Sequence, residues 1–190
     1  MSEKFLYVHD GETHKKIRKI LESERNNNGV ASIMSVELTP AEVLQGAQAG
    51  IMRQTKNIGR KLKHRYGAST ENDWQMHVEG CLGEMVVAKY LNMFWDGAVG
   101  IPHHGDIGRL EVRTSNYETA RLIVHDRDLS GSIFILVTGR NGSYSICGWI
   151  KGEEAKQGRF WKDPAGGRPA YFVPQSELNE IEKLYLRYNV

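Results

Sequence analysis

The feature that most limits the fold of this chain is the apolar run Ile133-Phe134-Ile135-Leu136-Val137. A strand with one solvated face alternates apolar and polar residues, and this run shows no alternation. We therefore expect residues 132–138 to form a central strand that is covered on both faces. Asn141-Gly142, just after it, predicts a tight hairpin turn. Three other segments rich in β-branched and aromatic residues are expected as strands: 109–115, 120–125 and 144–151.

Two helices are expected before these strands. Thr39 suits an N-cap, Pro40 suits the first helical position, and Glu42 is placed to complete a capping box. The spacing predicts a helix from Pro40 to about His64, with an apolar stripe of Val43, Leu44, Ala47, Ile51 and Ile58.

The second helix is predicted from about Asp73 to Asn92. Its apolar face is expected to contain Trp74, Val78, Leu82, Met85 and Val86. Gly80 and Gly83 lie inside it, and each costs up to ~1 kcal/mol relative to Ala. We expect close approach of another backbone to be the reason for both.

The order of these elements predicts an α/β fold with a central mixed sheet of four to five strands flanked by helices. A short closing helix is expected after Ser176, with Leu178, Ile181 and Leu184 on its apolar face. Asn26-Asn27-Asn28-Gly29 is a clear break in the first part of the chain. We therefore divide the chain into an N-terminal extension, residues 1–35, and one domain, residues 36–190.

Composition excludes several classes of protein. No apolar run approaches the roughly 20 residues of a membrane helix, and the N-terminus does not read as a secretory signal. Cys81 and Cys147 lack metal-ligand spacing, so we expect two buried small side chains and a reducing, cytoplasmic location. No Walker loop, dinucleotide-binding fingerprint, HExxH or serine-hydrolase elbow occurs.

Charge is distributed unevenly along the chain. Residues 1–70 carry twelve Lys and Arg against seven Asp and Glu, a balance of about +5. The remainder carries thirteen against sixteen, about −3. This pattern is compatible with a basic surface beside an acidic centre that binds a metal.

Asp106 and Glu111 are the candidate centre. Asp106 follows a glycine, Gly108 is well placed for a turn, and Glu111 lies five residues on in a predicted strand. This spacing can bring both carboxylates to one point, where Mg²⁺ would find oxygen ligands for phosphodiester chemistry. Alternation places Glu111, Arg113 and Ser115 on one face of the strand. A Glu111–Arg113 salt bridge on a solvated face is the alternative, and spacing alone leaves both open.

The residues Gly105-Asp106-Ile107 and Glu111-Val112-Arg113-Thr114-Ser115 resemble the G-D-x(n)-E-V-K-T-S signature of the PD-(D/E)XK nuclease superfamily. Residues 79–91 are similar to the helix that precedes this motif, which implies Glu84 as a third acidic group, with Glu79 as the fallback. The resemblance implies a restriction-endonuclease-like core. It also implies an endonuclease dependent on Mg²⁺ or Mn²⁺ that acts on DNA, in a bacterial or phage-infected cell. The implied metal ligands are Asp106, Glu111 and Glu84.

Arg113 departs from the signature, which usually has Lys at this position. Arginine can hold a phosphate or a water molecule, but it stays protonated and cannot act as a base. The departure favours an alternative, a catalytically inactive module that binds DNA or a host protein, such as a phage-encoded factor or inhibitor. An interaction arm formed by residues 1–35, a protein partner and a homodimer remain open.

Several basic and polar side chains are expected to contact nucleic acid. In segment 151–168, basic residues alternate with aromatic rings, which could stack on bases or could equally anchor a loop. His103 and His104 could join the site or lie in a plain surface loop. The candidate nucleic-acid contacts are Lys56, Arg60, Lys61, His104, Ser115, Lys151, Arg159 and Lys162.

Overall fold

The computed structural model describes residues 33–60, 72–97, 105–164 and 166–189, all within the compact unit formed by residues 31–190. Almost all of the predicted N-terminal extension therefore lies outside the described residues. The helices are α2 (Pro40–Gly59), α3 (Asp73–Leu91), α4 (Gly152–Ala155) and α5 (Ile181–Asn189). The strands are β1 (Met34–Glu37), β2 (Leu110–Ser115), β3 (Leu122–Val124), β4 (Ile133–Arg140), β5 (Ser143–Lys151), β6 (Trp161–Lys162) and β7 (Ala170–Val173). Short 3-10 turns lie at Gly158–Phe160 (η2) and Gln175–Glu177 (η3).

The main sheet has four strands in the order β1-β5-β4-β2, and it is mixed. β2 runs parallel to β4, whereas β4 and β5, and β5 and β1, are antiparallel. β4 lies inside the sheet and buries Phe134 to Thr138, which confirms the predicted central strand. Asn141 and Gly142 both have positive φ, 57° and 92°, in the turn between β4 and β5, as a tight hairpin requires. The α/β class with a mixed four-stranded sheet is thus confirmed.

Two strands differ from the prediction. Residues 122–124 do form a strand, but it belongs to a second sheet in the order β3-β7-β6. The fourth strand of the main sheet is β1 instead, which includes Met34 and Ser35 from the predicted extension. Alternation of apolar residues indicates a strand but not its partner, because pairing depends on how the connections run.

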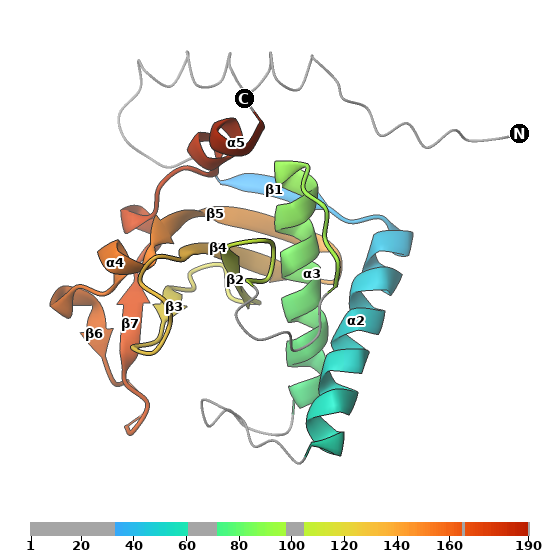
Figure 1. Ribbon diagram of the computed structural model, residues 1–190, viewed down its shortest axis with the longest axis horizontal. Helices are drawn as coiled ribbons and strands as arrows, with labels where there is room; N and C mark the ends of the chain where they lie inside the picture. Colours follow the sequence, from blue (N-terminus) through green and yellow to red (C-terminus); the bar gives the residue numbers. More distant parts are fainter. Residues whose placement is uncertain (1–32, 61–71, 98–104, 165, 190) are drawn as a thin grey trace, which may run out of the picture. The chain divides into compact units, whose positions relative to one another are not determined.

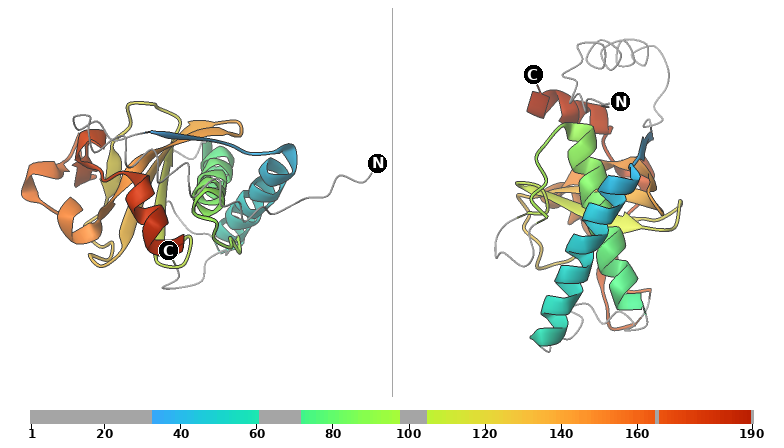
Figure 2. Two further views of the ribbon diagram at one scale, coloured as in Figure 1. Left: turned by 90° about the horizontal axis from the view of Figure 1, so that it is seen from above. Right: turned by 90° about the vertical axis from the view of Figure 1, so that its right-hand side faces the viewer.

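The main sheet is covered on both faces (Figures 1 and 2). Helix α3 packs on one face, and α2 lies outside α3. The opposite face packs against the second sheet. Its apolar core includes, among others, Leu122, Val124, Phe134, Leu136, Cys147, Ile150, Phe160 and Val173. Cys81 and Cys147 are both buried and unbridged, as predicted.

Helix α2 begins with the predicted capping box. The Thr39 hydroxyl accepts a hydrogen bond from the Glu42 main-chain N–H at 3.3 Å, and the Glu42 carboxylate accepts one from the Thr39 N–H at 2.6 Å. The helix ends at Gly59, five residues before its predicted end.

The predicted apolar stripe of α2 is largely wrong. Leu44, Ile51 and Ile58 are exposed by 61%, 48% and 56%. The buried side consists of Gly46, Ala49, Gly50 and Gln54. A Cβ atom at Gly50 would lie only 2.5 Å from the Cα of Val78. Small residues face α3 because the two helix backbones approach too closely for larger side chains.

Helix α3 occupies residues 73–91, close to its predicted bounds. Its second half is buried from Cys81 to Ala88, but Trp74 is exposed and does not join the predicted apolar face. At Gly83 the close neighbour is a side chain and not, as expected, another backbone: a Cβ would lie 1.9 Å from the Thr114 hydroxyl oxygen and 3.0 Å from Thr114 Cβ. The expectation of close packing therefore holds at Gly83 only for a side chain. It is wrong at Gly80, where a Cβ would meet nothing within 4 Å. None of the helices in the described ranges is long and apolar enough to cross a membrane.

These two glycines give a matched test of packing. Gly83→Ala should lower the free energy of unfolding by about 1–3 kcal/mol, because the methyl group forces α3 away from β2. Gly80→Ala should raise it by up to about 1 kcal/mol, because alanine favours the helix and finds open space. Urea denaturation measures the free energy of unfolding of both variants. Equal changes in this free energy would contradict the close contact at Gly83.

Candidate active site

Asp106 lies in a tight turn that leads into the edge strand β2. The Gly105 N–H donates to the Gly108 carbonyl at 3.1 Å, and Ile107 forms a bridge with Leu110. Gly108 has a φ of 62°, which favours glycine. The Asp106 carboxylate accepts a hydrogen bond of 2.7 Å from the Val112 N–H. Because β2 has a neighbour on one side only, this bond satisfies a main-chain donor that the sheet leaves unpaired.

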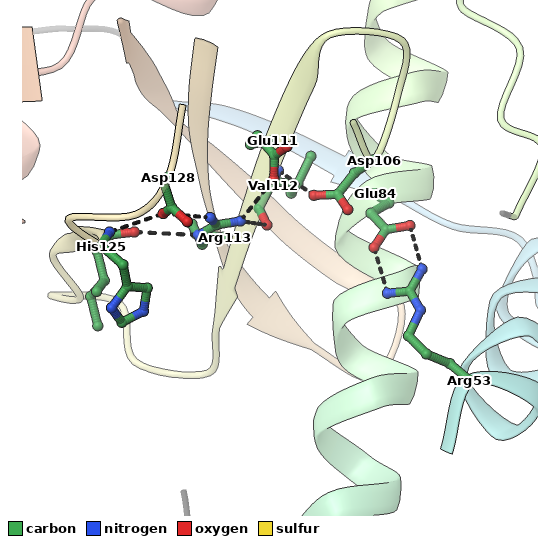
Figure 3. Close-up of polar contacts among 9 residues, drawn as sticks. Arg53, Glu84, Asp106, Glu111, Val112, Arg113, His125 and Asp128 are labelled. Atoms are coloured by element: carbon green, nitrogen blue, oxygen red, sulfur yellow. Dashed lines mark hydrogen bonds and ion pairs between the residues drawn. The ribbon is translucent and has the colours of Figure 1, made fainter. Parts of the chain in front are cut away.

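Glu84 reaches the same region from α3. Its carboxylate is bound at both oxygens by the Arg53 guanidinium of α2, at 2.7 and 3.1 Å, and it also accepts from the Trp95 indole at 3.1 Å. Figure 3 shows the carboxylates of Glu84 and Asp106 next to each other, with Arg53 on the far side of Glu84. Glu84 is almost fully buried. The fallback residue, Glu79, instead accepts from the Tyr144 hydroxyl at 2.5 Å.

Arg113 links two further carboxylates (Figure 3). It contacts Glu111 at 3.4 Å and Asp128 at 3.0 Å, and it donates to the carbonyls of Val112 and Ile123. Its guanidinium also lies over the Phe134 ring, 5.1 Å from the centroid. A guanidinium has five N–H donors, and four hydrogen bonds to the protein use most of them. Arg113 therefore holds acidic residues in place and has little capacity left for a ligand.

The three predicted carboxylates are destabilised as anions. Burial raises the pKa of Glu84 and that of Asp106, and the hydrogen bonds from Arg53 and Val112 only partly offset it. Burial also raises the pKa of Glu111, and repulsion from Asp106 adds to the effect. With Asp128, four carboxylates share the site with two guanidinium groups, those of Arg53 and Arg113. Because Asp106 repels both Glu84 and Glu111, ionisation of all three carboxyl groups at once is unfavourable.

These groups line one open cleft with a volume of about 2030 Å³. Glu84, Asp106, Glu111 and Asp128 contribute the acidic part of its lining. Its cationic side chains are all arginines: Arg53, Arg60, Arg109, Arg113, Arg121, Arg127 and Arg168. Arg53 and Arg113 bind the acidic residues of the site, so the binding of a polyanion would fall to other arginines of the lining, such as Arg60, Arg109 and Arg121. Arginine can hold phosphate oxygens through two parallel N–H groups.

The structure brings some of the predicted nucleic-acid contacts into the cleft and leaves others out. Ser115 and Arg60 line it. Lys56, Lys151, Arg159 and Lys162 are not among its lining residues.

Segment 151–168, whose cations are among the expected contacts to nucleic acid, contains α4, η2 and β6. Lys151 pairs with Glu153 at 3.4 Å, and Arg159 binds both oxygens of Glu177 at 3.1 and 2.9 Å. Phe160 is buried. Lys61, His103 and His104 lie outside the described residues.

Sequence reasoning missed Arg53 and Asp128 as site residues. Arg53 lies inside the predicted first helix and Asp128 in a turn after β3, and neither has a motif around it. His125 was missed as well. It lines the cleft, its N–H donates to the Asp128 carboxylate at 2.9 Å, and burial lowers the pKa of its imidazole although Asp128 opposes this.

The expected three-carboxylate metal ligand set is not assembled. Within the described ranges, no group of three or more His, Cys, Asp or Glu side chains is placed to hold a metal ion. Arg53 binds Glu84 and Arg113 binds Glu111 instead. Mg²⁺ often takes only one or two carboxylates, with water and substrate phosphates completing its shell. Asp106 with one neighbouring carboxylate would still offer Mg²⁺ the oxygen donors that it prefers.

Comparison of the chain with protein-family models, with curated proteins and with solved structures finds no match.

The raised pKa of Asp106 predicts how stability depends on pH. A carboxyl group whose pKa is higher in the folded state stabilises the fold at low pH, and this contribution is lost as pH rises through the folded pKa. Asp106→Asn should therefore raise Tm at pH 7.5, since Asn Oδ1 can still accept from Val112. The difference from wild type should shrink as pH falls towards 5. Thermal unfolding in EDTA, with exposed Glu118→Gln as control, measures this. An Asp106→Asn variant less stable at every pH would contradict it.

The contacts of Arg113 predict a second stability effect. Arg113→Lys should lower the free energy of unfolding by about 1.5–3 kcal/mol, because one ammonium group cannot bind Glu111, Asp128 and two carbonyls together. Arg109→Lys, an exposed arginine just before β2, is the matched control and should be nearly neutral. Equal stability of the two variants in urea would show that Arg113 does not hold the acidic residues.

Proposed function

We propose that this protein is a nuclease that hydrolyses phosphodiester bonds of DNA with the help of Mg²⁺ or Mn²⁺. The observation that carries the proposal is the cleft in which Glu84, Asp106 and Glu111 share an excess of negative charge, within a lining of arginines. A divalent cation would relieve the repulsion between the carboxylates, and the arginines would bind phosphates on either side of it.

Each group has a proposed role. Asp106, with Glu84 or Glu111 beside it, would hold the cation. When bound, the cation supplies charge stabilisation at the phosphoryl oxygen and a more acidic water. Arg60 and Ser115 bind the DNA backbone. Arg113, which cannot accept a proton, positions Glu111 and Asp128.

We also propose that α3 and the main sheet form a restriction-endonuclease-like core. Two features support this assignment. The helix that carries Glu84 packs against the strand that carries Glu111, and that strand follows directly from the turn with Asp106. This is the arrangement that the motif resemblance implies. Arg113 in place of Lys is the feature against it.

The alternative function is a module of the same fold that binds DNA or a host protein without catalysis. The ion pairs Arg53–Glu84 and Arg113–Glu111 favour it, because they neutralise the carboxylates internally. In that case, carboxylate substitutions would leave partner binding nearly intact.

Cleavage of a supercoiled plasmid and a single-stranded oligonucleotide distinguishes the two functions. The wild-type protein should cleave with Mg²⁺ or Mn²⁺, and EDTA should abolish cleavage. Asp106→Ala and Glu111→Ala should reduce cleavage below detection, and Glu84→Gln should impair it. Glu79→Gln provides a matched control on the same helix, because Glu79 is not among the cleft residues and binds Tyr144. No cleavage and no Mn²⁺ binding by purified wild-type protein would overturn the catalytic proposal.

A further inference from the structure

Tyr117 presents an exposed aromatic ring to the cleft. It lies two residues after the end of β2, past a bend at Asn116. Its side chain is 72% exposed, and it is part of the same cleft lining as Asp106. An exposed ring on the wall of an open cleft is accessible to a ligand that enters the cleft, and a planar ring can stack on a flat group of that ligand.

The turn that carries Tyr117 is held in place by hydrogen bonds. The Tyr117 N–H donates to the Ser115 hydroxyl at 3.2 Å, and the Ala120 N–H donates to the Tyr117 carbonyl at 3.0 Å. The Gln175 side-chain amide donates to the carbonyls of Glu118 and Ala120 at 2.7 and 3.0 Å. The main chain on both sides of Tyr117 is thus anchored to β2 and to η3. The ring is presented to solvent by a fixed turn, so little conformational entropy would be lost on binding a ligand.

The surroundings of the ring indicate the kind of ligand. Arg121, four residues on, is exposed and lines the cleft, as does the Ser115 hydroxyl. Proteins that bind single-stranded nucleic acids combine a positively charged groove with aromatic rings on which bases stack. Bases inside a duplex are already stacked on their neighbours and would have to be extruded to reach such a ring.

We propose that Tyr117 is a stacking platform for an unpaired base, and that the cleft therefore prefers a single-stranded polynucleotide to a duplex. The inference rests on the proposed function in one respect, the binding of a nucleic acid in this cleft. It does not require that the bound strand be cleaved.

The test is equilibrium binding of fluorescently labelled oligonucleotides to the full chain in EDTA, measured by anisotropy. The probes are an oligothymidylate, an oligouridylate of equal length and a DNA duplex. The wild-type protein should bind a single strand more tightly than the duplex. Tyr117→Ala should weaken single-strand binding by roughly 10-fold or more and leave duplex binding nearly unchanged. Tyr117→Trp should retain the affinity, whereas Tyr117→Leu, which is apolar but has no ring, should not.

Trp74→Ala is the control for the loss of an exposed aromatic ring. Trp74 is exposed on the first turn of α3 and is not among the cleft residues, so its removal should not change binding. If one single-stranded probe binds more tightly than the other and its binding depends on Tyr117, the result supports the stacking site. Tighter binding of the oligothymidylate identifies the ligand as DNA, and tighter binding of the oligouridylate identifies it as RNA.

Two results would overturn the inference. One is unchanged single-strand binding by a folded Tyr117→Ala variant, and the other is tighter binding of the duplex than of either single strand. Each of these is independent of the cleavage assay, because cleavage by the wild-type protein would still support the nuclease. Conversely, binding that depends on Tyr117 without any cleavage would retain the stacking site and favour the non-catalytic alternative.

Discussion

The contact between Gly83 and Thr114 brings helix α3 against the edge strand of the main sheet, and the candidate site depends on it. A side chain at residue 83 would hold the helix away from β2. Glu84 is the next residue, so the same close approach places its carboxylate beside Asp106, which is itself fixed by the main-chain N–H of Val112. A helix and a turn distant in the sequence thereby meet at one edge of the sheet. The glycine acts on the site only by leaving room for the Thr114 side chain, and it takes no part in the chemistry.

The excess of negative charge at this edge opposes folding. Burying like charges together is unfavourable, and two guanidinium groups compensate for only part of it. Arg53 comes from α2, so the close α2–α3 packing at Gly50 also delivers the counterion of Glu84. Side chains that carry only structural roles would be more stable as neutral or fully paired groups. The carboxylates of this open cleft are only partly neutralised by guanidinium groups, which favours a cationic ligand at this position.

Much of the scaffold could be predicted from local patterns. The unbroken run in β4, the capping box of α2 and Asn141-Gly142 each have a local physical cause, and the structure shows all three. The apolar stripe of α2 could not be predicted this way. Periodicity identified Leu44, Ile51 and Ile58 as one face, but close helix packing selected the face with glycine and alanine. Periodic spacing identifies faces, and only the neighbouring element decides which one is buried.

In the candidate site, too, some features could be predicted from local sequence and others could not. The spacing of Asp106 and Glu111 could be read from the sequence because both lie in one turn and strand. The Glu111–Arg113 ion pair was one of the two alternatives that this spacing left open, and the structure contains it. The other ion pairs could not be predicted, because Arg53, Asp128 and Glu177 come from other segments of the chain. For the same reason, counting the cations in residues 151–168 could not show which of them lie at the cleft. Lys151 and Arg159 are paired with acidic residues and lie outside the cleft lining, whereas the arginines of the lining come from many separate segments. The electrostatic character of a surface is a property of the fold, so the polarity of this cleft, acidic at its centre and rich in arginine around it, emerges only when those segments are assembled.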